Sequence, residues 1–183
     1  MLKIQTLSPS KLTSEILIEK ENFILKSHQI SNIFSITEYE NEREQLSQKF
    51  KNFFLLDLPD IGKFNMNKNS IAIWLRANSY FVVTKKKYDD VMNTCNNLAS
   101  ITDQTGGWIT LNLEGKLTKS LLEKLLTLDL DLLKKENAVR VSINKINCLV
   151  LCNKQFENYT IFCPVSFFET MKKRLVNLTN LIA

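Results

Sequence analysis

Short apolar runs and polar breaks divide the first part of the chain into predicted elements. Clusters of aromatic and β-branched residues at 23–25 and 33–36 favour strands. A charged stretch over 40–50 is predicted to be helical, because large apolar side chains recur there four residues apart. Residues 57–70 contain proline, glycine and several asparagines, which is typical of a loop.

A hairpin and a helix are predicted next. The apolar runs at 71–75 and 80–83 are separated by four residues, a length that suits a hairpin connection. A helix is predicted over 88–99, because apolar residues recur at i, i+4 and i+7. These residues are Val91, Cys95 and Leu98.

The second part of the chain also contains both strand-like and helix-like patterns of apolar residues. Residues 108–113 alternate with period two, as in a half-buried strand, and residues 117–126 are predicted to be helical, with Thr118 as the N-cap. Three further strands are predicted before a final helix. They lie at 139–143, 148–152 and 159–163.

The final helix has a local start signal. Ser166 and Glu169 match a capping box, in which the serine side chain bonds the N3 amide and the glutamate reaches back. Phe168, Met171 and Leu175 continue one apolar face after it.

The order of these elements, ββαββα followed by βαβββα, predicts an α+β fold. We expect mixed or antiparallel sheets with helices on one face, arranged as two small ferredoxin-like halves. Residues 1–20 are weakly patterned and are predicted to be a loosely attached arm. Apolar faces are spread evenly over the rest, so 21–183 is predicted as a single domain with halves at about 21–100 and 101–183.

Charge and hydropathy set the expected partners. The formal net charge is +5, but the basic residues are dispersed and the only tight run is 85–87, so nucleic-acid binding is not favoured. No apolar run approaches the ~20 residues that cross a bilayer. The first residues lack the features of a signal peptide, and a cytoplasmic location is therefore expected.

The four cysteines are predicted to be buried, reduced thiols. They occur in apolar contexts without a C-x-x-C pair. Cys148 and Cys152 flank a strand pattern, where a four-residue separation places them about 13 Å apart. One metal ion could not hold both. The set is Cys95, Cys148, Cys152 and Cys163.

The residues for common catalytic sites are scarce. His28 is the only histidine and lies in a polar stretch, where an exposed turn is expected, so neither a histidine-based triad nor a histidine zinc site is favoured. With four glycines the chain has no phosphate-binding loop, and it is not expected to hold FAD or NAD itself. Gly106 and Gly107 form the only glycine pair and predict a turn.

The carboxylate pairs are not predicted to converge on a site. Asp89 and Asp90 are adjacent at a helix start, where they point about 100° apart and stabilise the helix dipole. Asp129 and Asp131 form the other close pair. We assign no catalytic, cofactor-binding or metal-binding residue from the sequence.

Two tryptophans and one polar segment complete the candidates. Trp74 and Trp108 lie in strand patterns and are predicted to anchor a core or an interface. The segment 103–105, Asp-Gln-Thr, precedes the second of these strands. Short Asp-x-Thr segments bond their own backbone, so a turn is predicted here.

The stretch from Ile101 to Gly115 resembles the TDxSHgxxxLrlsG motif of sarcosine oxidase gamma subunits and, more loosely, of the aminomethyltransferase superfamily. Residues 73–82, 126–130 and 159–167 resemble further family segments in the same order, covering about 70–180. The chain departs from the family pattern in three places. It has Gly106 in place of a histidine, residues 76–79 in place of Gly-Pro-Asp-Glu, and no proline before Leu128.

This resemblance implies a non-catalytic gamma subunit of a heterotetrameric, flavin-dependent sarcosine oxidase, which oxidatively demethylates sarcosine to glycine. The fold would be a reduced aminomethyltransferase folate-binding domain without a cofactor. FAD, FMN, NAD and tetrahydrofolate would belong to partner subunits. The partners would be the alpha, beta and delta subunits, and the isolated chain would self-associate.

Two alternatives stay open. A stand-alone folate-binding protein of the same superfamily would need an acid to hold the pterin, for which Asp103 is the candidate. A nucleic-acid-binding module is suggested by charge alone and would require basic residues gathered on one face with exposed aromatics.

Overall fold

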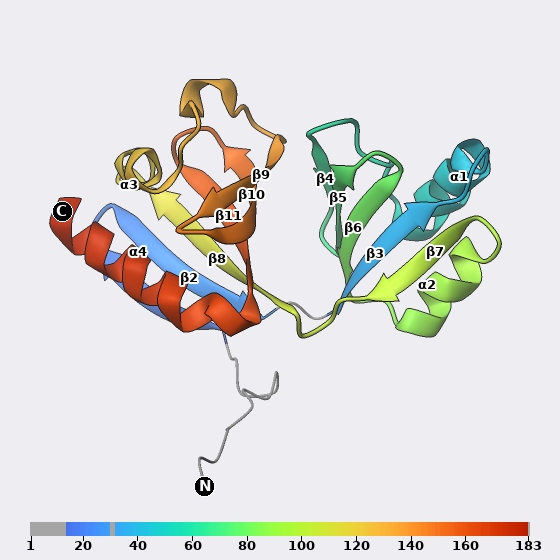
Figure 1. The fold of residues 1–183 in the computed structure, drawn as a ribbon, viewed down its shortest axis with the longest axis horizontal. Coiled ribbons are helices and arrows are strands. Elements are labelled where there is room, and N and C mark those ends of the chain that lie inside the picture. Colours follow the sequence, from blue (N-terminus) through green and yellow to red (C-terminus); the bar gives the residue numbers. More distant parts are fainter. Residues whose placement is uncertain (1–13, 30–31, 183) are drawn as a thin grey trace, which may run out of the picture.

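Two antiparallel sheets form the protein, whose computed structural model describes residues 14–29 and 32–182 (Figure 1). Every strand pair within them is antiparallel, so the predicted α+β class is confirmed. The six-stranded sheet has the order β1 (Glu15–Lys20), β2 (Phe23–Gln29), β8 (Trp108–Gly115), β11 (Asn158–Pro164), β10 (Ile146–Lys154), β9 (Ala138–Ile143). The five-stranded sheet has the order β4 (Phe64–Met66), β5 (Ser70–Arg76), β6 (Ser79–Thr84), β3 (Asn32–Glu38), β7 (Ala99–Asp103).

Helices cover the outer face of each sheet (Figure 1). The five-stranded sheet buries Phe34, Ile36 and Val82 against α1 (Arg43–Phe54) and α2 (Tyr88–Cys95). The six-stranded sheet packs against α3 (Thr118–Leu125) and α4 (Phe168–Ile182). Two short 3-10 helices, η2 (Leu130–Leu132) and η3 (Val165–Phe167), complete the described helices.

The inner faces of the two sheets share a third apolar cluster. Alternation along each strand sends one set of side chains to the helices and the other set to the opposite sheet. Backbone bonds join the sheets beside this cluster, from Phe64 N to Glu136 O at 3.0 Å and from Ala138 N to Gly62 O at 2.8 Å. The cluster contains Ile33, Phe64, Ile73, Leu75, Phe81, Ala138, Leu149, Leu151 and Phe162.

The predicted halves at about 21–100 and 101–183 do not coincide with the sheets. Strand β2 pairs with β8, and the chain then enters the other sheet at β3. It returns only after β7, which pairs with β3. Alternation identifies a strand but not its partner, and the β2–β8 pairing joins residues 80 or more positions apart, as in His28 with Thr110.

Several local predictions need correction. Residues 15–20 of the predicted loose arm form β1, which pairs with β2, whereas residues 1–13 lie outside the described residues. The predicted loop contains β4, and the predicted helix over 88–99 ends at Cys95, before β7. Three residues of β4 are too few to display an alternating pattern.

Neither predicted helix cap is present. Thr118 is already inside α3, and its hydroxyl donates to Glu157 O at 3.3 Å. Ser166 lies within η3, two residues before α4 begins at Phe168. A local capping pattern therefore does not by itself fix where either helix begins.

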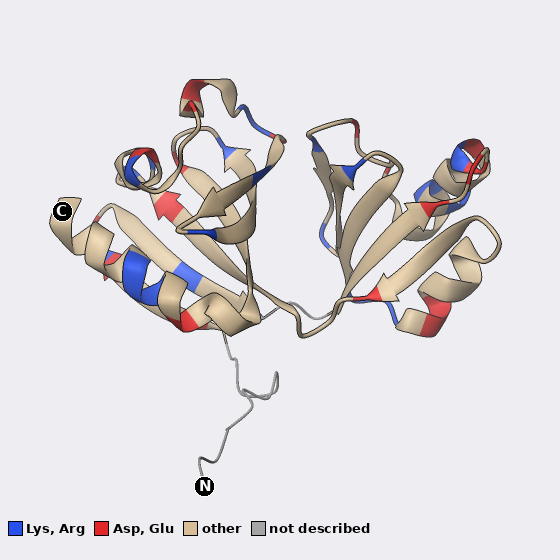
Figure 2. Ribbon diagram, in the orientation of Figure 1, with Lys and Arg blue, Asp and Glu red and all other residues tan. Residues whose placement is uncertain are grey.

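Charged residues are interspersed over both halves of the molecule. Figure 2 shows basic and acidic positions together on α1 and α4 and along the loops. This distribution does not favour the nucleic-acid alternative, which needs a concentrated basic face. Among the described residues, no helix combines the length and apolar character needed to span a bilayer.

Candidate functional site

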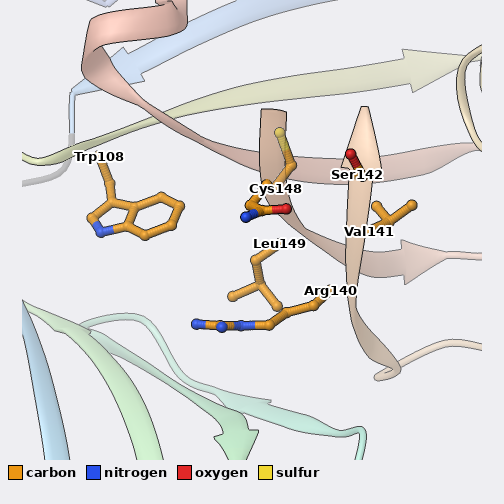
Figure 3. Close-up of a pocket in the computed structure, with 7 residues that line it drawn as sticks. Trp108, Arg140, Val141, Ser142, Cys148 and Leu149 are labelled. Atoms are coloured by element: carbon orange, nitrogen blue, oxygen red, sulfur yellow. The ribbon is translucent and has the colours of Figure 1, made fainter. Parts of the chain in front are cut away.

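A pocket of about 420 Å³ opens on the inner face of the six-stranded sheet (Figure 3). Its lining comes from β8, β9 and β10. The volume lies within the range of about 300–1,000 Å³ that small-molecule sites occupy. Its lining residues are Trp108, Arg140, Val141, Ser142, Asn147, Cys148 and Leu149.

Strand register gathers the polar side chains of this pocket. Arg140 pairs with Leu149, and Ser142 pairs with Asn147, in the β9–β10 hairpin. Directly paired residues project from the same face of a sheet, and so do residues two apart on one strand. Leu149 also pairs with Phe162 of β11, and two positions further along β11 the pairing reaches Trp108.

The pocket is rich in hydrogen-bond donors. Within the described part of the chain, the side chains of Arg140, Ser142, Asn147 and Trp108 make no hydrogen bond or ion pair with another residue. The guanidinium group has five N–H donors and the indole group has one. None of the described residues that line the pocket is an aspartate or a glutamate.

The Asp103–Thr105 segment forms the predicted turn between β7 and β8. Thr105 N donates to Asp103 Oδ1 at 2.8 Å, as in an Asx turn. The Thr105 hydroxyl accepts from Ile33 N at 3.2 Å, and Gln104 N donates to Ile33 O at 2.8 Å. The turn therefore fixes the point where the chain passes between the sheets, and Asp103 does not line the pocket.

A polar network around the buried Glu38 side chain, on the other sheet, could not be found from the sequence. The Glu38 side chain is only 4% exposed, and its Oε1 lies 3.4 Å from Arg43 Nη1. Arg43 donates to the Tyr80 hydroxyl at 2.7 Å, and that hydroxyl donates to Glu38 Oε2 at 3.4 Å. Burial, followed by the Glu38 charge, raises the pKa of Tyr80. The network links the start of α1 to β3 and β6, so its role is to position the helix.

The four cysteines are free and buried, as predicted. Burial raises the pKa of Cys95 to about 11, with Lys49 opposing the change. A hydrogen bond with Cys148 raises the pKa of Cys163 and lowers that of Cys148. Cys95, Cys152 and Cys163, whose pKa values are raised, stay protonated at neutral pH and are poor nucleophiles and poor metal ligands.

The remaining candidate residues are separate from one another. His28 is exposed, as predicted, but it lies in β2 and not in a turn, with Nδ1 3.2 Å from Ser14 Oγ. Asp89 and Asp90 occupy the first turn of α2. Asp129 Oδ1 accepts from Asp131 N at 2.9 Å at the start of η2. No group of three potential metal-ligating residues occurs among the described residues.

Comparisons with known proteins give structural matches only. No protein-family model matches the sequence, and no curated protein matches it. A chain of heterotetrameric sarcosine oxidase from Corynebacterium sp. U-96, in complex with pyrrole 2-carboxylate, matches with a TM-score of 0.77 and 15% identity over 91% of this chain and 88% of that chain. Glycine cleavage system aminomethyltransferase T from Bartonella henselae matches with a TM-score of 0.58 and 11% identity, over 82% of this chain and 45% of that chain.

This chain has the sarcosine oxidase- and aminomethyltransferase-like fold. The segments that resemble sarcosine oxidase gamma subunits are the β5–β6 hairpin, the β7–β8 turn with both of its strands, residues 126–130, which lead from α3 into η2, and the junction of β11 with α4. Gly106, which replaces the motif histidine, has φ of +80°. Glycine adopts this backbone conformation without steric cost, so the departure has a local structural reason.

Proposed function

We propose that this chain is the non-catalytic gamma-type subunit of a heterotetrameric sarcosine oxidase and contributes assembly and stability. The observation that carries the proposal is the extent of the structural match, 91% of this chain and 88% of the matched chain. Nearly the whole chain thus corresponds to nearly the whole of one chain from a hetero-oligomeric enzyme. The proposed partners are alpha, beta and delta subunits.

In this proposal the partner subunits, and not this chain, bind the catalytic cofactors. The chain has four glycines and no glycine-rich phosphate-binding motif, which supports placing FAD, FMN and NAD on the partners. Tetrahydrofolate is likewise assigned to a partner, since Asp103, the candidate acid, takes part in a turn. Its carboxylate already accepts the Thr105 amide within a turn and does not face the pocket.

A docking surface for the partners is suggested beside β4. Four apolar side chains here are strongly exposed, and two neighbouring hollows of about 320 and 270 Å³ lie among them. Exposed apolar clusters of this kind mark protein interfaces. We name this surface the β4 rim. It comprises Leu55 (77% exposed), Ile61 (80%), Met66 (55%) and Leu132 (75%).

Purification of the tagged chain from its native organism tests the proposed function. We expect flavin absorbance and sarcosine-dependent oxygen uptake to co-elute with the chain. Ile61→Asp and Leu132→Asp should lose both, because a charge in an apolar interface is costly to desolvate. Leu181→Asp is the matched control, because Leu181 is equally exposed (80%) but lies near the end of α4, away from the β4 rim. Recovery of the wild-type chain as a free monomer would contradict the proposal.

The stand-alone folate-binding alternative is favoured only by the fold shared with the aminomethyltransferase. Calorimetric titration of the isolated chain with tetrahydrofolate tests it directly. Heat that is lost in Asp103→Asn would support a pterin site at Asp103, whereas the turn predicts no such heat in either protein.

A further inference from the structure

The pocket beside Trp108 combines an aromatic wall with the exposed Arg140, which has no ion-pair partner among the described residues. Figure 3 shows Trp108 and Arg140 projecting into the same space, with Leu149 between them. Trp108 is held by an edge-to-face contact with Phe81, at 5.4 Å between ring centroids and 72° between planes. The indole ring is therefore fixed by the opposite sheet while part of it stays exposed to the pocket.

The charge of the pocket selects an anion. Arg140 has no acidic partner among the described residues, and the side chains of Ser142 and Asn147 add further uncommitted donors. A guanidinium group binds a carboxylate through two parallel N–H···O bonds. A cationic ligand would meet repulsion from Arg140 with no acid to offset it.

The apolar part of the lining indicates that the ligand carries a planar ring. Trp108 offers a partly exposed, flat π-surface for stacking, whereas Leu149 is only 2% exposed. An inorganic anion such as phosphate would leave the indole surface unused. A planar ring bearing a carboxylate would use the ring surface and the donors together.

We propose that the Trp108–Arg140 pocket is a binding site for small aromatic carboxylates. The ring stacks on Trp108, and the carboxylate pairs with Arg140 with support from Asn147 or Ser142. This site is independent of the proposed subunit role, since it uses only residues of this chain: the inner face of the six-stranded sheet, with Trp108 held by Phe81 of the other sheet.

Fluorine NMR of 4-fluorobenzoate, titrated with the full-length chain, tests the site. We expect saturable line broadening with the wild type and with Arg76→Gln, a matched exposed arginine on β5. Arg140→Gln should weaken binding by about tenfold or more, because charge-assisted hydrogen bonds are lost. The affinity of Arg140→Lys for 4-fluorobenzoate should lie between those of the wild type and Arg140→Gln, since lysine keeps the charge but not the bidentate geometry.

Two further compounds test the ligand specificity of the pocket. Benzylamine, with the charge reversed, and inorganic phosphate, without a ring, should not displace 4-fluorobenzoate. The proposal is overturned if 4-fluorobenzoate shows no saturable binding, if Arg140→Gln binds it as the wild type does, or if either probe displaces it. The titration uses the isolated chain, so its outcome does not depend on whether flavoprotein partners co-purify.

Discussion

Trp108 of β8 and Phe81 of β6 meet edge to face, with ring centroids 5.4 Å apart and planes inclined by 72°. The two rings come from different sheets, so their contact belongs to the apolar cluster that joins the sheets. The same indole ring forms one wall of the pocket. One contact therefore couples the association of the sheets to the shape of the candidate site.

A double-mutant cycle should detect this contact. For Trp108→Leu and Phe81→Leu we expect a coupling energy of about 0.5–1.5 kcal/mol, the usual contribution of an aromatic pair beyond its buried area. Urea denaturation of both single variants and the double variant measures it. Phe50 belongs to the separate cluster between α1 and its sheet. The effects of Phe50→Leu and Trp108→Leu on the free energy of unfolding should therefore be additive. Additive behaviour of the Trp108–Phe81 pair would refute a specific contact.

Gly115 should tolerate no side chain. Its φ is +116°, and an added Cβ would overlap the Asn22 carbonyl oxygen and lie 2.9 Å from the Phe23 Cα. Gly115→Ala should therefore cost about 2–4 kcal/mol in the free energy of unfolding. Thermal and urea denaturation would measure this loss.

Gly107→Ala is the matched control for that substitution. Its Cβ would lie 3.2 Å from Gln104 O, and the backbone is not in the left-handed region. We expect a cost below about 1 kcal/mol. Equal losses of stability in Gly107→Ala and Gly115→Ala would show that the close approach of β8 to the β1–β2 turn does not cause the cost of substituting Gly115.

Asp103 should stabilise the folded chain through the turn that it forms with Thr105. Asp103→Ala removes the acceptor of the Thr105 amide and should lower the free energy of unfolding by about 1 kcal/mol. Asp103→Asn keeps a side-chain oxygen and should remain close to the wild type. Denaturant midpoints of the three proteins check this order. A stable Asp103→Ala protein would show that the turn does not need the side-chain bond.

Alkaline pH should destabilise the chain partly through Cys95. Burial raises the pKa of this thiol from 9.0 to about 11, so the native state favours the neutral form. As the pH rises above 9, the unfolded chain loses its proton first. The stabilisation is complete below pH 9 and declines up to about pH 11, with a slope of at most about 1.4 kcal/mol per pH unit.

Cys95→Ala isolates this contribution. The variant should be less stable at pH 8, because a buried side chain is truncated, but its stability should fall less steeply between pH 9 and about 11. Urea midpoints across this range compare the two slopes. Parallel curves would mean that ionisation of Cys95 does not limit alkaline stability.

The α+β class and most elements could be predicted from the sequence. Hydrophobic periodicity is local, so the β5–β6 hairpin, the alternation in β8 and the apolar face of α4 follow from neighbouring residues. The turn at Asp103 is local as well, because its bond joins residues two positions apart.

Tertiary structure alone decided how the strands are shared between sheets and where the pocket lies. Nothing near β2 in the sequence specifies β8 as its partner, and nothing near Arg140 specifies that it shares a pocket with Trp108. Both depend on contacts between residues far apart in the chain, which form only when whole sheets pack. A local pattern determines which face of a strand is apolar, but only packing determines what that face meets.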